Sequence, residues 1–207
     1  MKKGCGKKLW RACAGIVLAL AVWITAAPYA VGAETTGDAK SQAQEIRQIQ
    51  DNIVSWKAGA EGEKQLLAGD LLDGAGSPGS DWYAFTIARM GEEKENQAAY
   101  LSRLQDAVEN VYADLEDSKT RYRLSDIHRM ALTVMACGGD PENFGTDPDG
   151  NPINLIRDSV WNSLWGDPGD QGINGYIWAL LTIDAKNYQE PESAEWTRDK
   201  IISELLS

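Results

Sequence analysis

The sequence is poor in the side chains that usually build reactive or metal sites. It contains one histidine, His128, and three cysteines. Two of those cysteines, Cys5 and Cys13, lie in a predicted signal peptide, so Cys137 stands alone and no internal disulfide is expected. His128 and Cys137 fall on one predicted helix, roughly 13 Å apart at the helical rise, which excludes a Cys–His catalytic pair. The apolar run around Cys137 favours a buried, inert thiol.

Other patterns are missing as well. Nothing in the chain alternates apolar and polar residues with a period of two, so no strand is predicted. There is no Gly-x-Ser-x-Gly elbow for a nucleophilic serine. Acidic residues are numerous, but no two of them are singled out as a glycosidase pair. These absences favour a non-catalytic protein without placing the chain in a functional class.

The first 33 residues have the pattern of a signal peptide. A basic region is followed by an apolar core over residues 16–27 and by the small-residue site Val31-Gly-Ala33. We therefore expect cleavage after Ala33, export to the outside of the cell or its surface, and no further membrane segment; an uncleaved N-terminal anchor is the less favoured alternative. Residues 34–42 are polar and are predicted to be a flexible N-terminus. Residues 43–207 are then left as one domain.

The exported chain is strongly acidic. Removal of the five basic residues of the signal peptide changes the net charge from −11 to −16. Nucleic acids and anionic membranes require basic surfaces, so neither is expected as a partner.

Helical periodicity runs through the rest of the chain. Apolar stripes predict a helix over 43–56 and an amphipathic helix over 92–117, and Asn151-Pro152 and Pro191 are predicted to open two more. Ser80 and Ser125 are predicted to cap two helices that are apolar on nearly every face. A third such helix is expected over 173–186. The stripe residues are Ile46, Ile49, Ile53 and Trp56 in the first helix, and Leu101, Leu104, Val108, Val111 and Leu115 in the second.

The three apolar helices repeat one another. Aligned on Ala84, Ala131 and Ala179, they recur with a period of 47 and then 48 residues. A period in this range is typical of stacked repeat units. The sequence thus predicts an all-α fold of helix pairs of about 47 residues, with apolar helices inside and amphipathic helices outside.

Several short segments share a further pattern: Ser80–Ala84 with Met90-Gly91, Cys137–Pro141, Asn154–Ile156 and Gln171–Leu180. These segments resemble the α/α-toroid repeats of exported Gram-positive proteins. This family is similar to the terpenoid-cyclase and protein-prenyltransferase repeat superfamily, which includes the cobalamin carriers. The resemblance implies inner helices around a cavity and covers residues 43–207.

The family's chemistries are not carried by this chain. The cyclase motifs Asp-x-Asp-Asp and Asp-Asp-x-x-Asp are absent, Cys137 lacks the thioester context, and one histidine cannot complete a prenyltransferase zinc site. Six helix pairs close a toroid in the family, but only about three are present here. We expect either a half-ring completed by another chain, as in a homodimer, or a shortened reading frame, with the second favoured.

Candidate ligand-binding residues lie where the inner helices begin, at the predicted mouth of the cavity. No cofactor is expected. A calcium site at Asp147 and Asp149 is a weaker alternative, because Pro152 occupies the position where an EF-hand loop requires glycine. The candidates for ligand contact are Asp81, Trp82, Tyr83, Asp126, His128, Gln171, Asn174, Tyr176 and Trp178.

Two functions remain open. The favoured one is an exported, non-catalytic binding or surface-interaction module for an unknown small molecule or extracellular partner. The alternative is a terpenoid-cyclase-like or prenyltransferase-like enzyme whose catalytic half is missing.

The signal-peptide prediction is directly testable. Expressed in a Gram-positive host, the protein should be recovered outside the cytoplasm with Glu34 as its first residue. Intact-mass spectrometry of the recovered protein measures this. An N-terminus at Met1 on membrane-bound protein would contradict cleavage.

Overall fold

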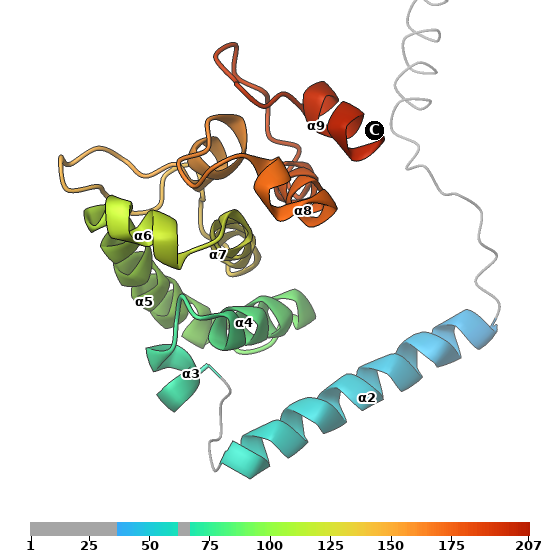
Figure 1. Ribbon diagram of the computed structural model, residues 1–207. Coiled ribbons are helices and arrows are strands. Elements are labelled where there is room, and N and C mark those ends of the chain that lie inside the picture. Colours follow the sequence, from blue (N-terminus) through green and yellow to red (C-terminus); the bar gives the residue numbers. More distant parts are fainter. Residues whose placement is uncertain (1–36, 62–66) are drawn as a thin grey trace, which may run out of the picture. The chain divides into compact units, whose positions relative to one another are not determined.

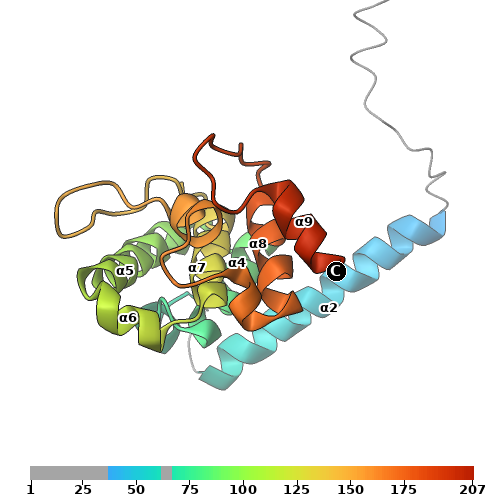
Figure 2. The ribbon, with the colours of Figure 1, turned by 45° about the horizontal axis from the view of Figure 1, so that its top comes forward.

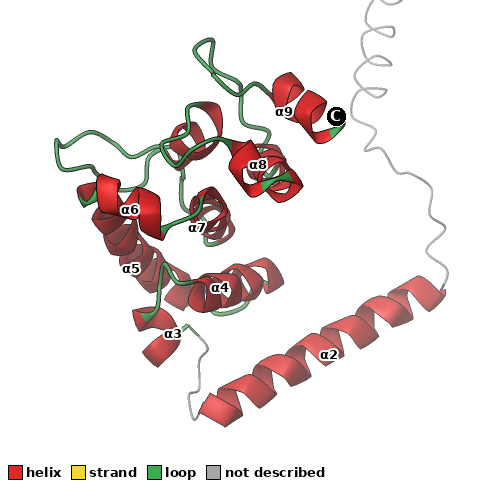
Figure 3. Cartoon of the chain, viewed as in Figure 1, coloured by secondary structure: helices red, strands yellow, loops and turns green. Residues whose placement is uncertain are grey.

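The computed structural model describes residues 37–61 and 67–207, so the predicted signal peptide lies outside the described residues. The chain divides between Asn52 and Ile53 into two units. Over the described ranges it forms helices and turns with no strand, apart from one isolated bridge between Thr146 and Pro152 (Figure 3). The predicted all-α class is therefore confirmed for this part of the chain. None of its helices is long and apolar enough to cross a membrane.

The first described helix is α2 (Gly37–Glu61). It begins earlier than the stripe predicted, so residues 37–42 of the expected flexible N-terminus are helical. The stripe itself is exposed, with Ile46 and Ile49 in the first unit and Ile53 and Trp56 in the second.

The predicted apolar helices are α4 (Pro78–Met90), α7 (Leu124–Ala136) and α8 (Ile173–Asp184). In Figure 1 they form a stack in which α7 lies between α4 and α8. The three aligned alanines, Ala84, Ala131 and Ala179, are completely buried. A methyl side chain at these positions lets neighbouring helices approach closely.

These three helices run parallel to one another. Arg129 in the middle of α7 contacts Asp81 near the start of α4, and Cys137 after α7 contacts the carbonyl of Ala84 further along α4. Lys186 after α8 donates to the carbonyl of Gly139, just beyond α7, at 3.4 Å. Parallel neighbours need a return segment between them, which explains why the repeat is so long.

The return from α4 to α7 is made by α5 (Lys94–Ala113) and α6 (Leu115–Arg121). The predicted amphipathic helix over 92–117 is therefore present but breaks at Asp114. Its buried face carries the residues that the stripe indicated, among them Leu104, Val108 and Val111. A short helix, α3 (Gly69–Asp73), precedes α4.

The return from α7 to α8 is not the amphipathic helix that was predicted to open at Asn151-Pro152. Its helical parts are short: a π-helical turn, η1 (Arg157–Trp161), and a 3₁₀ turn directly before α8. The backbone of Ile153 bonds to Phe144 and Gly145, and the N–H of Leu155 donates to the carbonyl of Pro141 at 2.7 Å. These bonds to the preceding loop replace helical ones. The spacing of apolar residues in this segment therefore reflects burial along its length and not a helix.

The C-terminal part also differs from its prediction. A 3₁₀ turn, η2 (Pro168–Gln171), leads into α8, and the last helix is α9 (Arg198–Leu205), beside α8 in Figure 2. This helix was expected to open at Pro191. It begins later because the Thr197 side chain accepts a hydrogen bond from Lys200 N at 3.1 Å.

Two predicted caps are wrong by a few residues. The cap of α4 is Ser77, whose hydroxyl accepts from Ser80 N, while Pro78 occupies the first helical position. At α7 the cap is Arg123, whose N–H donates to Asp126 at 2.9 Å. Serine is common at and just inside helix starts, so local sequence alone did not distinguish the positions.

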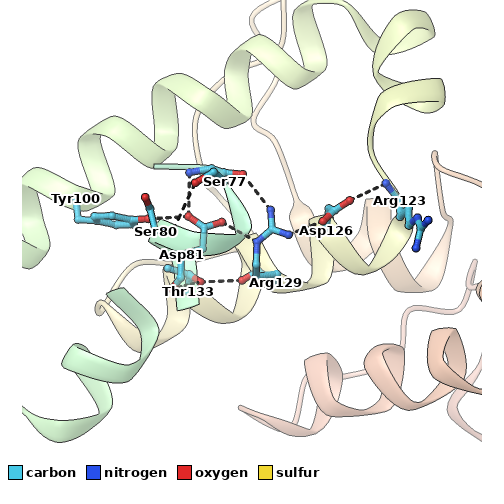
Figure 4. A network of polar contacts seen from close by, with 9 residues as sticks. Ser77, Ser80, Asp81, Tyr100, Arg123, Asp126, Arg129 and Thr133 are labelled. Carbon is cyan, nitrogen blue, oxygen red and sulfur yellow. Dashed lines mark hydrogen bonds and ion pairs between the residues drawn. The ribbon is translucent and has the colours of Figure 1, made fainter. Parts of the chain in front are cut away.

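A buried polar network joins α4, α5 and α7 (Figure 4). The carboxylate of Asp81, fully buried, accepts from Arg129 Nε at 3.0 Å, Tyr100 OH at 2.7 Å and Gly76 N at 2.9 Å. Arg129 also donates to the carbonyl of Gly76 and to Asp126. The Asp81 carboxylate and the Arg129 guanidinium thus both have hydrogen-bond partners. A charged group can be buried only when it is paired in this way.

Breaking this network should destabilise the fold. Asp81→Ala leaves the Arg129 guanidinium, only 4% exposed, without its buried partner, and we expect a loss of about 3–5 kcal/mol in the free energy of unfolding. Urea unfolding followed by circular dichroism measures it. The matched variant Asp126→Ala removes the partly exposed contact of the same arginine and should cost clearly less. Equal losses would contradict a central role for Asp81.

Candidate functional site

A pocket of about 590 Å³ lies against one face of the three parallel helices. Its volume is in the range of small-molecule sites. The lining is mainly aromatic and aliphatic, with charged groups from two of the helices. It consists of Trp82, Phe85 and Arg89 from α4, Leu132, Met135 and Ala136 from α7, and Trp178, Leu181, Asp184, Ala185 and Lys186 from α8 and the residues after it.

Helical spacing explains the lining. On α4 the three residues fall at i, i+3 and i+7, which places them on one side of the helix. The middle helix α7, which is flanked by α4 and α8, contributes Leu132, Met135 and Ala136. The two outer helices supply the longer side chains.

Aromatic side chains from α4 and α8 meet at this pocket. The rings of Trp82 and Trp178 are 5.5 Å apart between centroids, at an angle of 38°. Phe85 stands nearly perpendicular to Trp82 at 5.7 Å. All three rings are only partly buried. Partly exposed aromatic rings that line one concavity are a common basis for ligand contact.

The charged side chains lie toward the C-terminal ends of the helices. Asp184 is paired with Arg198 of α9. Lys186 donates a hydrogen bond to the carbonyl of Gly139, and no carboxylate in the described part of the chain pairs with it. Arg89, at the end of α4, has neither an ion pair nor a side-chain hydrogen bond with the described residues.

Two of the predicted site residues, Trp82 and Trp178, line the pocket. Tyr83 is adjacent on α4 but is not part of the lining. Asp81 and Asp126 are partners of Arg129 in the buried network. Their carboxylates are thus occupied within the fold.

The remaining predicted residues lie at the starts of α7 and α8. Gln171 caps α7, since in the amide orientation that satisfies both of its polar atoms it accepts from Leu124 N and Ser125 N. Asn174 is exposed, and the ring of Tyr176 packs at 5.9 Å from that of Trp196. Neither belongs to the pocket lining. The ligand face thus lies further along the helices than the predicted mouth.

The glycine-rich motif around Gln171 has a structural role. A Cβ added to Gly175 would lie 1.8 Å from the carbonyl oxygen of Pro168, so only glycine allows η2 to pack against α8. Gly172 has a φ of 61°, in the left-handed region. This motif sets the direction in which α8 leaves the turn.

Several pocket residues were not predicted, notably Phe85, Met135 and Leu181. One signal could have found the residue on α4. Once Trp82 is taken as lining a site, the i+3 and i+7 positions of the same helix identify Phe85 and Arg89. The pocket residues of α7 could not be found in this way, because they depend on which face of α7 the neighbouring helices α4 and α8 leave uncovered.

The loop proposed as a weaker calcium site forms a turn held by its own hydrogen bonds. Asp147 accepts from Asp149 N at 3.0 Å, and from the backbone and side chain of Asn151. These bonds lower the pKa of Asp147. In the described ranges no group of three or more His, Cys, Asp or Glu side chains is placed to hold a metal.

Cys137 is buried, as its apolar run indicates, and burial raises the pKa of its thiol to about 11. A thiol with a raised pKa has little thiolate at neutral pH and is a poor nucleophile.

Comparison of the chain with protein-family models, curated proteins and solved structures found no significant match.

His128 is fully buried, and its Nε2 lies 2.9 Å from the carbonyl oxygen of Ser159. Burial disfavours the charged imidazolium and lowers the pKa of His128 to about 4 from 6.5. The unfolded chain therefore takes up a proton at higher pH than the folded protein does. Stability should fall as the pH drops from about 6.5 toward 4.

This contribution can be isolated with His128→Gln, which keeps a donor for Ser159. Between pH 7.5 and 5.0 the wild type should lose about 2 kcal/mol more unfolding free energy than the variant. Urea unfolding at both pH values measures the difference, and the carboxylates shared by both proteins cancel. Identical pH dependence in the two proteins would contradict a neutral, buried His128.

Proposed function

We propose that this chain is an exported, non-catalytic binding module and that its ligand occupies the pocket between α4, α7 and α8. The observation that carries the proposal is the set of partly exposed apolar side chains from three helices around one cavity. A core would normally bury such side chains, because each exposed aromatic ring forfeits a sizeable hydrophobic gain. A ligand would recover it.

The arrangement of the helices supports a partial α/α toroid as the fold. Inner helices of a toroid are parallel and share a concave face, and α4, α7 and α8 are parallel neighbours with a pocket on one face. The repeat is less regular than the sequence suggested, since an amphipathic helix joins α4 to α7 but a loop with short π-helical and 3₁₀ turns joins α7 to α8. Completion of the ring in a homodimer belongs to the same proposal.

The alternative, an enzyme of the cyclase or prenyltransferase type, finds less support in this pocket. Protonating or ionising an apolar substrate requires acidic or metal-binding groups at the cavity. Asp184 is the only carboxylate in the lining, and Arg198 pairs with it. A mainly apolar lining with one paired carboxylate fits ligand binding better than acid catalysis.

The binding proposal can be tested with N-phenyl-1-naphthylamine, a neutral aromatic dye whose fluorescence increases in apolar sites. Wild-type protein should bind one equivalent in a saturable manner. Ala136→Trp places an indole in the pocket lining and should weaken binding at least tenfold by occupying the space. Fluorescence titration gives both dissociation constants.

Ala99→Trp is the matched control. It adds the same side chain to an exposed position on α5, outside the pocket, and should leave dye binding unchanged. Circular-dichroism melts establish that both variants remain folded. Absence of saturable binding by the wild type, or equal binding by both variants, would rule out this pocket as the ligand site.

A further inference from the structure

The charged groups of the pocket are unevenly balanced. Arg89 and Lys186 have no carboxylate partner among the described residues, whereas the one acid in the lining, Asp184, already has Arg198. The pocket therefore carries surplus positive charge in a chain whose overall net charge is −11. Positive charge gathered in one pocket of an acidic protein calls for a physical explanation.

One explanation is that the two cations complement the helix ends. The C-terminus of a helix carries about half a negative charge, which falls off within the last turn. Some of the terminal carbonyls are already bonded: Gly91 N donates to Ala88 O, Gly139 N to Val134 O, and Ala185 N to Leu181 O. Each helix end carries only about half a charge, so the three nearby ends do not cancel the two full side-chain charges.

The positions of the groups along the pocket define a direction. On α4 the apolar surface extends from Trp82 through Phe85 to Arg89, a distance of about 10 Å along the helix axis. The aromatic side chains thus occupy one part of the cavity and the cations the other. A ligand that satisfies both parts has a compact apolar body and an anionic group at one end.

On the premise of the proposed function, we infer that the pocket selects a compact hydrophobic organic anion, an aromatic or branched aliphatic acid with a single anionic group. The planar fork of the Arg89 guanidinium matches a carboxylate, while Lys186 supplies a second, point-like charge. The rings of Trp82, Phe85 and Trp178 receive the apolar body. The anionic end stays near solvent, so only the apolar end is fully desolvated.

Two dyes that differ by one group test this selection. 1-Anilinonaphthalene-8-sulfonate has the skeleton of N-phenyl-1-naphthylamine with an added sulfonate. The double variant Arg89→Gln/Lys186→Gln should bind the sulfonate roughly fivefold to tenfold more weakly than the wild type, and the neutral dye within twofold of it. The loss should shrink as salt is raised, because salt screens exposed charges.

The control Arg103→Gln/Lys119→Gln removes the same total charge from α5 and α6, outside the pocket, and should affect neither dye. Equal weakening of the sulfonate by both double variants would reduce the effect to overall charge and overturn the inference. Wild-type protein that binds the neutral dye but not the sulfonate would also overturn it, while leaving the binding proposal intact. Failure of both dyes would instead remove the proposed function.

Discussion

The fold depends on one buried ion pair. Asp81 near the start of α4 pairs with Arg129 in the middle of α7 in a buried region, and Tyr100 brings α5 to the same carboxylate. Because a buried charge tolerates no partner that is misplaced or missing, the pair fixes how far α4 can slide along α7. The side chains one to two turns further along both helices inherit that register. The pocket residues of α4 and α7 are among them.

The pocket is formed by the surface of α4, α7 and α8 that their packing against one another does not bury. The aligned alanines let the three parallel helices approach closely, and all three are completely buried. Larger side chains of the same helices line the pocket on the remaining face. Their apolar surface and the two cations at its end are therefore available to a ligand. The pocket lies on the face that helix packing did not require.

The periodicity of apolar residues predicted the helices well where a helix has one solvent-exposed side or is buried on all sides. The stripe of α5, with Leu104, Val108 and Val111, indicated both its existence and its buried face. The same reasoning failed after Asn151. Ile153, Leu155 and Ile156 are buried there, but the backbone of Ile153 and Leu155 bonds to the preceding loop instead of forming helical hydrogen bonds. Apolar spacing reports burial, and a helix is only one way to produce it.

The sequence by itself determined the all-α class, the three apolar helices with their shared alanines, and two aromatic residues of the candidate site. These are local or periodic properties, fixed by residues within a few turns of one another. Only the tertiary structure decided that Asp81 and His128 are structural, and that Arg89 and Lys186 share one cavity. Those two cations are nearly a hundred residues apart, and their meeting depends on the parallel packing of α4, α7 and α8, which no local pattern specifies.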